Sequence, residues 1–460
     1  MLKTITPIDN TIYVERNYAT PQEIEDVLNS SKQVFPDWSR TSIKERKKII
    51  TKFVESFLKN NKEIVEELCR QMGRPISQCS GEMRGFEERA RYMIEKSEQA
   101  LEKVISKQND EFDNFIRKDP LGTIFIIAPW NYPYNTSVNS IVPSLLSGNT
   151  VILKHSSQTP LCAEQLFQAA KSAGIPEGVF QFLHLNHQST SNIISDERID
   201  HILFTGSVSG GRQVKKAIGE RFINAGLELG GKDPAYVRKD CNLEHAIENL
   251  ADGSFYNSGQ SCCGIERIYV DNEVYDDFVS GIKTFTEKYI LDDPLKSETN
   301  LGPVVKLSAA QSIRLQVKEA ISNGAKDIIG KTNFKISEDS NCYVSPSVLI
   351  DVDHSMNYMM EETFGPTVGI MKVNNENEAV KLMNDSPYGL TACIWTSDKE
   401  FAEKFGPKIS TGTFFMNRCD YLDPGLAWTG VKNTGIGVTL SVLGFDHVTR
   451  AKSYHHRTIK

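Results

Sequence analysis

Two short stretches, GTIFIIAPW at residues 122–130 and NTVILKH at residues 149–155, decide the fold class. Each is a continuous apolar run flanked by Gly, Pro or Asn, which is typical of a β-strand buried on both faces. Segments with helical spacing separate these runs from three more, which are GVFQFLHL (178–185), HILFTGS (201–207) and NAGLEL (224–229). Strands that alternate with helices in this way predict an α/β fold with a parallel, doubly wound sheet.

Polar and small residues gather where these predicted strands end. Asn131 follows the first strand, Lys154 ends the second, Gly206 and Ser207 close the fourth, and Glu228 lies at the end of the fifth. The carboxyl ends of parallel strands share one edge of a sheet, and ligands of doubly wound sheets bind there. The sequence therefore predicts a ligand site at this edge.

A second alternation of strands and helices begins near residue 242. Its strand candidates are ERIYV (266–270), SPSVLI (345–350), TVGIMKV (367–373), TACIWTS (391–397) and TGTFFMN (411–417). We therefore expect a second, separate α/β domain. Residues 21–106 have helical spacing instead, and Gly73 is expected to end one of these helices.

Length and composition exclude several classes of protein. The chain has 460 residues, 39% hydrophobic and 24% charged, which suits a globular protein of two or three domains. Its net charge of −7 includes no basic stripe, so we expect no nucleic-acid partner. It has neither a bilayer-spanning apolar run nor an apolar signal region. Nine scattered cysteines favour reduced thiols in a cytoplasmic protein.

Two adjacent cysteines, Cys262 and Cys263, stand in the stretch NSGQSCCGIERIYV (257–270). They could be buried packing residues, part of a metal site, a disulfide, or a nucleophile with a bystander. A metal site lacks ligands at suitable spacing, so we expect none, and a disulfide between neighbouring residues is strained. A nucleophile needs a polar pocket and a partner that moves protons, which these residues alone do not establish.

Several segments together resemble the aldehyde dehydrogenase superfamily. They are PWNYP (129–133), GNTVILKHSSQTP (148–160), FTGS (204–207), LELGGKDP (227–234), FYNSGQSC (255–262), EETFGP (361–366) and NDSPYGL (384–390), in the order the family has them. The resemblance implies a fold of two Rossmann-like α/β domains with a small β extension for oligomerisation. It assigns residues 1–108 and 121–235 to the nucleotide-binding domain and 236–438 to the catalytic domain. Residues 109–120 and 439–460 form the extension.

The resemblance also implies a mechanism and its residues. Cys262 adds to an aldehyde, and Asn131 and the Cys262 backbone N–H stabilise the resulting oxyanion. A hydride then leaves to NAD or NADP, which converts the adduct to a thioester. Glu228 activates the water that hydrolyses this thioester. Cys263 is then a bystander, either inert or able to trap an oxidised Cys262. The expected cofactor-binding residues are Trp130, Lys154, Ser157, Gly206, Ser207, Gly211, Leu229, Glu362 and Phe364. Pyrophosphate oxygens would meet the helix that opens at Gly206.

This sequence departs from the family pattern at the cofactor and substrate positions. Many NAD-preferring members have Lys-Pro-Ser-Glu where this chain has Lys154-His155-Ser156-Ser157. Serine cannot repel a 2′-phosphate, so we expect NADP to be accepted. Bacterial succinate-semialdehyde enzymes often have an arginine at the position that Asn139 occupies here. The absence of this arginine weakens the hypothesis that the chain is such an enzyme. We expect Tyr132, Tyr134, Asn135, Tyr92 and Trp428 to line the substrate tunnel, with Asn139 beside them.

Alternative functions stay open. One is a succinate-semialdehyde-type dehydrogenase in particular. Another is a CoA-acylating dehydrogenase, in which a thiol resolves the thioester, but such members generally lack the base that Glu228 supplies. A third is a retired scaffold protein, against which the intact Cys262, Glu228, Asn131 and Glu362 argue. The resemblance also implies a homodimer or homotetramer, joined through residues 109–119 and the C-terminal strand.

Overall fold

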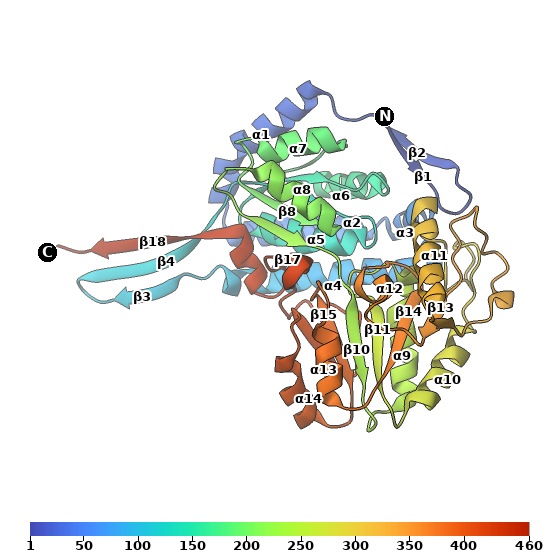
Figure 1. Ribbon diagram of the computed structural model, residues 1–460. Helices are drawn as coiled ribbons and strands as arrows, with labels where there is room; N and C mark the ends of the chain where they lie inside the picture. The colour runs from blue at the N-terminus through green and yellow to red at the C-terminus, as the bar shows by residue number, and fades with distance from the viewer. Residues whose placement is uncertain (460) are drawn as a thin grey trace.

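The computed structural model describes residues 1–459 and contains two α/β units and a projecting β-ribbon (Figure 1). Each unit has its own central sheet, and the ribbon extends away from both, carrying the C-terminal strand. A small antiparallel hairpin, β1 (Leu2–Ile5) and β2 (Ile12–Arg16), lies near the N-terminus. The α/β class predicted from the sequence is confirmed.

The first sheet holds all five strands predicted between residues 122 and 229. They pair in parallel in the order β9-β8-β5-β6-β7, and a short strand from near the C-terminus, β17, adds to β9 in antiparallel fashion. Their bounds are β5 Thr123–Ile127, β6 Thr150–Lys154, β7 Phe180–Phe182, β8 His201–Thr205, β9 Ala225–Glu228 and β17 Gly435–Ile436.

Alternate residues of β5 face opposite sides of this sheet, which explains its continuous apolar sequence. Ile124 and Ile126 pack into one hydrophobic core with α2, α4, α5 and α6, whereas Phe125 and Ile127 pack into another with α1, α7 and α8. The bounds of these helices and of α3 are α1 Pro21–Arg40, α2 Ile43–Leu58, α3 Asn61–Met72, α4 Ile76–Ala100, α5 Pro133–Leu146, α6 Pro160–Ser172, α7 His187–Ser195 and α8 Val208–Ile218. Gly73 ends α3 in a left-handed conformation, as predicted.

The second sheet contains all five predicted strands and two that the sequence did not reveal. Its order is β12-β13-β14-β11-β10-β15-β16. The bounds are β10 Asp233–Val237, β11 Ile265–Asp271, β12 Lys326–Asp327, β13 Ser347–Ile350, β14 Thr367–Val373, β15 Thr391–Trp395 and β16 Thr413–Met416. The central β10 was missed because Pro234 argues against an inner strand, but a register shift between Asp233 and Pro234 accommodates it.

Helices cover both faces of the second sheet. α9 and α10 pack on one face, and α13 and α14 pack on the other. The bounds are α9 Leu243–Phe255, α10 Tyr275–Thr286, α11 Leu307–Ser322, α12 Asn357–Met360, α13 Glu376–Asn384 and α14 Lys399–Phe405. Short 3-10 turns occupy Tyr256–Gly259, Lys331–Asn333, Gly406–Lys408, Lys432–Thr434 and Leu443–Val448. Among residues 1–459, no helix is both long and apolar enough to cross a bilayer.

The domain limits in the structure differ from those that the sequence predicted. The differences arise from the β-ribbon and from segments that pass from one unit to the other. The ribbon comprises β3 (Val104–Gln108), β4 (Phe112–Pro120) and β18 (Thr449–Arg457), and β4 pairs with β18 as predicted. The expected limit at residue 108 is therefore too late, because β3 already belongs to the ribbon. The limit at residue 235 cuts β10. Residues 435–448 leave the second unit and return to the first, where β17 pairs with β9.

Candidate active site

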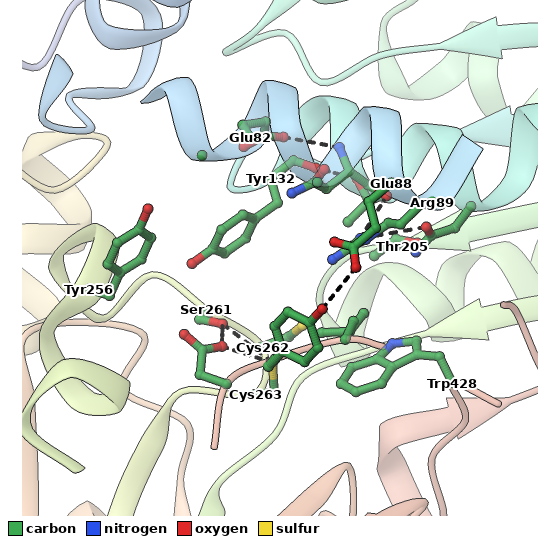
Figure 2. Close-up of a pocket in the computed structure, with 18 of the residues that line it drawn as sticks. Glu82, Glu88, Arg89, Tyr132, Thr205, Tyr256, Ser261, Cys262, Cys263 and Trp428 are labelled. Atoms are coloured by element: carbon green, nitrogen blue, oxygen red, sulfur yellow. Dashed lines mark hydrogen bonds between the residues drawn. The ribbon is translucent and has the colours of Figure 1, made fainter. Parts of the chain in front are cut away.

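Two cavities meet at Cys262 and Glu228, between the two units. One, of about 220 Å³, lies at the carboxyl ends of β5, β8 and β9. The other, of about 340 Å³, lies below α4, from which Glu88 and Arg89 point toward it (Figure 2). Cys262, Glu228 and Thr205 line both cavities. This places one thiol and one carboxylate where two bound molecules would touch.

The loop that carries Cys262 has an unusual backbone. Asn257, Ser258 and Gly259 all have positive φ, and a Cβ on Gly259 would lie 2.1 Å from the Gly365 carbonyl oxygen. The loop is tied down on several sides: the Gln260 side chain accepts from the Val305 N–H at 2.8 Å, and the Ser258 hydroxyl donates to the Gly302 carbonyl at 2.8 Å. Strained positions of this kind persist only where surrounding contacts hold them.

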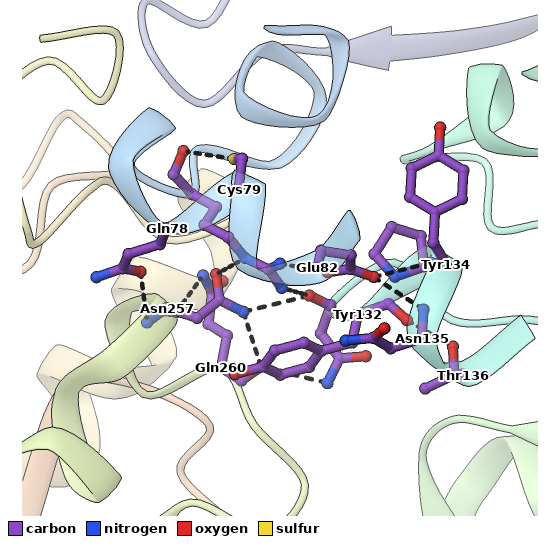
Figure 3. A network of polar contacts seen from close by, with 12 residues as sticks. Gln78, Cys79, Glu82, Tyr132, Tyr134, Asn135, Thr136, Asn257 and Gln260 are labelled. Atoms are coloured by element: carbon purple, nitrogen blue, oxygen red, sulfur yellow. Dashed lines mark hydrogen bonds and ion pairs between the residues drawn. The ribbon is translucent and has the colours of Figure 1, made fainter. Parts of the chain in front are cut away.

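Asn131 points its amide at this loop. Its Nδ2 donates to the Gln260 carbonyl at 3.2 Å, and an amide nitrogen carries a second N–H that can serve a ligand. The backbone N–H of Cys262 makes no hydrogen bond within the described chain. Behind them, Arg74 donates to the Asn131 carbonyl and, at 3.1 Å, to Asn257 Oδ1. Figure 3 shows Asn257 beside Gln260. The two N–H donors are thus held by a buried network.

Cys263 faces a different set of groups. Its thiol donates to Asp420 Oδ1 at 3.0 Å, and Ser261 donates to the same oxygen at 2.7 Å. Contact with Cys262, burial and the Asp420 charge raise the pKa of the Cys263 thiol well above its ordinary value. Burial raises the pKa of Asp420 to about 6. Cys263 is therefore a neutral thiol engaged with a carboxyl group, which fits a bystander.

Glu228 ends β9 and is held by two hydroxyl groups. Thr439 donates to Glu228 Oε1 at 2.5 Å, and Thr205 donates to Oε2 at 3.0 Å. Burial raises the pKa of Glu228 above its ordinary value, against the opposing effects of these two hydrogen bonds and of the Arg89 charge. A carboxylate with a raised pKa is a stronger base near neutral pH.

The smaller cavity has the features of a dinucleotide site. Trp130 and Phe364 line it with their rings 5.6 Å apart, beside Leu229, Gly206, Ser207 and Glu362. Ser207 caps the N-terminus of α8, whose first amides can hold phosphate oxygens. Glu362 accepts from the Gly231 N–H at 2.9 Å, and burial raises the pKa of this carboxyl to about 7. Planar walls, backbone N–H groups and a carboxylate fit a nicotinamide nucleotide.

Three expected cofactor residues lie outside this cavity. Gly211 packs against Leu229, where a Cβ would come within 2.7 Å of the leucine side chain. Ser157 is exposed, and its carbonyl accepts from the Thr4 hydroxyl at 2.8 Å. Lys154 ends β6, and burial lowers its pKa to about 8. Among the described residues no carboxylate lies within salt-bridge distance of Lys154. The roles of Lys154 and Ser157 stay predictions.

The larger cavity contains four of the six residues expected to line the substrate tunnel. Tyr132, Asn135, Asn139 and Trp428 line it. The expectation for Tyr134 was wrong, because its side chain is fully buried against Phe57, with the rings 4.9 Å apart. Tyr92 is not among the residues that line this cavity.

Sequence comparison identifies the family. A model of the aldehyde dehydrogenase family matches residues 1–454. The chain belongs to this family. It is 31% identical to the NADP-dependent succinate-semialdehyde dehydrogenase of Deinococcus radiodurans over 450 residues, covering 98% of this chain and 93% of the relative. It is 30% identical to the NAD(P)-dependent succinate semialdehyde dehydrogenase of Escherichia coli, covering 96% of each chain.

Solved structures agree with this assignment. The NADP complex of succinic semialdehyde dehydrogenase from Streptococcus pyogenes superposes with a TM-score of 0.95 at 27% identity, with both chains fully covered. The protein is an NAD(P)-dependent aldehyde dehydrogenase that oxidises an aldehyde to a carboxylic acid. The aldehyde dehydrogenase fold predicted from the motifs is confirmed.

Sequence reasoning missed several residues of the site in this enzyme. Thr439 and Asp420 belong to distant segments with no motif of their own, and only folding brings them to Glu228 and Cys263. The sequence does contain a signal for the position of Arg89. Gly81, Gly85 and Arg89 lie four residues apart and therefore on one face of α4. A Cβ on Gly85 would lie 2.8 Å from the Asn135 amide, so this helix face approaches α5 closely.

Replacing the two cysteines one at a time separates their roles. Cys262→Ala should abolish aldehyde oxidation but leave NADP binding intact, because it removes the nucleophile that the family motif predicts and no other cavity wall. Cys263→Ala should keep most of the activity, since its thiol is neutral and bound to Asp420. Steady-state rates and fluorescence titration with NADP measure both effects. An inactive Cys263→Ala enzyme beside an active Cys262→Ala enzyme would reverse the assignment.

Proposed function

We propose that Cys262 is the nucleophile, that Asn131 and the Cys262 N–H bind the oxyanion, and that Glu228 is the general base. The observation that supports these roles is the position of Cys262 and Glu228 on the walls of both cavities. A thiol there can reach an aldehyde from one cavity while a cofactor fills the other. A carboxylate there can reach a water beside the same carbon.

The steps follow from these positions. The Cys262 sulfur bonds to the aldehyde carbon, and the new oxyanion accepts hydrogen bonds from Asn131 Nδ2 and the Cys262 N–H. The bound nicotinamide supplies a hydride acceptor. Loss of hydride leaves a thioester on Cys262. Glu228 then removes a proton from water as its oxygen attacks the thioester, and the acid leaves with the thiolate restored. Thr205 and Thr439 orient Glu228 throughout.

Glu228→Gln should allow one turnover and then stop. Glutamine keeps the size of the side chain but cannot accept the proton of the hydrolytic water, so the thioester accumulates. Rapid mixing should show a burst of NADPH close to one equivalent per site, followed by a rate near zero. Full steady-state turnover would remove Glu228 from the mechanism. Turnover restored by coenzyme A would instead favour the acylating alternative.

We also propose that the enzyme accepts NADP at least as well as NAD. Lys154 has no carboxylate partner among the described residues, and the exposed Ser157 stands where many relatives have a carboxylate. A hydrogen bond to a charged group contributes about 1.5–3 kcal/mol, which is one to two decades in affinity. The D. radiodurans relative is named for NADP and the E. coli relative for either cofactor.

Ser157→Glu should lower kcat/KM for NADP by at least about tenfold, because a repulsion of about 1.4 kcal/mol is enough for that change. It should leave kcat/KM for NAD nearly unchanged, which serves as the internal control. Burial lowers the pKa of Lys154 to about 8, so the parent enzyme should also show a rising KM for NADP above that pH. A parent enzyme that rejects NADP would contradict the proposal.

For the substrate, we propose a short aldehyde with an anionic group at its other end. Arg89 lines the substrate cavity and donates to the Asn135 carbonyl at 2.9 Å and to Asn139 Oδ1 at 3.5 Å. No carboxylate lies within 4 Å of this guanidinium in the part of the chain described. Arg89, on the neighbouring helix α4, thus lies beside Asn139. Bacterial succinate-semialdehyde enzymes often have an arginine at the position of Asn139 itself. Succinate semialdehyde, the substrate in the relatives' names, carries such an anionic group.

Arg89→Gln should raise KM for succinate semialdehyde by at least about tenfold, since a lost hydrogen bond between charged groups costs about 1.5–3 kcal/mol. KM for butanal, which has no carboxylate, should not rise. Arg84→Gln is the matched control, because Arg84 lines the same cavity but is exposed to solvent. Equal KM changes for the charged and the neutral aldehyde would reject a role for Arg89 in recognising the anion.

We further propose that the enzyme is a cytoplasmic homodimer or homotetramer. All nine cysteines are free, which suits a reducing compartment. The ribbon strand β3 is exposed at every position, and it presents Val104 and Ile105 to solvent. Such an unpaired, partly apolar edge favours pairing with another chain.

Light scattering should therefore give a mass of two or four times 51.6 kDa. Replacing Ile105 with Lys on the exposed edge should shift the mass toward one chain, because a charged side chain disfavours edge pairing. A particle of 51.6 kDa for the parent enzyme at micromolar concentration would reject the oligomer.

A further inference from the structure

Glu228 also lines a third cavity, which is separate from the two described above. Its volume is only about 10 Å³, and its polar walls are Ser140, Thr205, Thr439 and His447. A space of this size holds about one water molecule, provided that two or more polar groups surround it. The general base therefore has a small polar space of its own, which neither the cofactor cavity nor the substrate cavity contains.

His447 reaches this space through a gap that two glycines leave open. A Cβ on Gly226 would lie 2.5 Å from His447 Nε2, and a Cβ on Gly437 would lie 2.6 Å from it. Only glycine permits the ring edge to stand there. Nε2 is buried and has no hydrogen-bond partner among the described residues. Leaving a buried polar atom without a hydrogen-bond partner costs about 1–3 kcal/mol of folding free energy. A molecule bound in the cavity that hydrogen-bonds to this nitrogen would remove that cost.

The surroundings of His447 leave it free to exchange protons. The side chain is half-buried in the turn Leu443–Val448, so it connects the small cavity with the protein surface. Its ring packs edge-on against His201 of β8, with centroids 5.0 Å apart. Burial lowers the pKa of both imidazoles, and His201 is the titratable side chain packed directly on His447. Among the walls of the cavity, Glu228 is the acidic group.

The chemistry of the enzyme requires an exit for a proton. Each turnover transfers one proton from the hydrolytic water to Glu228, and Glu228 must lose it before the next turnover. The substrate cavity and the cofactor cavity would each hold a bound molecule during turnover, whereas the third cavity would hold neither. The third cavity borders the same carboxylate.

We propose that a single water in this cavity connects Glu228 with His447 Nε2, and that His447 passes to solvent the proton that Glu228 takes up. The proton moves from Glu228 to the water while the water gives one of its own to Nε2, and His447 then releases a proton to solvent. His447 acts through Glu228 and touches neither substrate nor cofactor. The proposal rests on the role of Glu228 as the general base.

His447→Ala should lower the steady-state kcat by about tenfold, below the roughly 10²–10⁴-fold contribution of a group that acts on the reacting atoms. The NADPH burst of the first turnover should be unchanged, because formation of the thioester does not use this route. Millimolar imidazole should restore much of the lost rate. Pyrazole, a ring of the same size and a far weaker base, should not, which separates proton transfer from filling of space.

Two further variants separate loss of the relay from other effects of the His447 substitution. Ser140→Val fills the small cavity and leaves His447 in place, so it should lower kcat in the same way but resist imidazole. His187→Ala, at the exposed start of α7, is the histidine control and should be neutral. A steady-state kcat within twofold of the parent in His447→Ala would overturn the relay, as would equal rescue by pyrazole. If Glu228→Gln turns over normally, the proposed base fails; if it stalls while His447→Ala is normal, only the relay fails.

Discussion

A buried ion pair, Arg74 with Glu82, supports the whole active site. Both side chains are almost completely buried, so each charge depends on the other for its stability. Burial opposes the charge on Arg74, but the neighbouring groups, of which Glu82 acts most strongly, together raise the pKa of the guanidinium. Glu82 accepts from the N–H groups of Tyr134 and Asn135, which belong to the first turn of α5 (Figure 3). Removing one partner of such a pair costs about 3–5 kcal/mol.

This pair connects parts of the chain that carry different chemical roles. Through Arg74 it fixes the carbonyl of Asn131, from the first unit, and the side chain of Asn257, from the loop that carries Cys262. Asn257 in turn donates to the Gln260 carbonyl, which also accepts from Asn131. The proposed oxyanion donors and the proposed nucleophile are therefore positioned by one set of hydrogen bonds, although they come from opposite sides of the domain interface.

The interface itself depends on segments that cross between the units. β17 and Thr439 return from the second unit to pair with β9 and to hold Glu228. On the side of the second unit, Lys232 Nζ donates to Glu266 Oε2 at 2.5 Å. Glu266 also accepts hydrogen bonds from the backbone N–H groups of Thr363 and Phe364. This places Glu362 and Phe364 over the cofactor cavity. The cofactor cavity, the proposed base and the proposed nucleophile thus meet because each unit supplies residues to the other.

The sequence by itself determined the strands, the parallel sheets and the family, because continuous apolar runs and short motifs are local properties. It also placed the candidate nucleophile, base and oxyanion amide, since each lies in a motif or at a strand end. Tertiary structure decided what these residues touch. Thr439, Asp420 and His447 carry no local signal for their contacts, and β10 was hidden by Pro234. Their roles arise from distances between residues far apart in the chain, and such distances exist only after the two sheets have packed against each other.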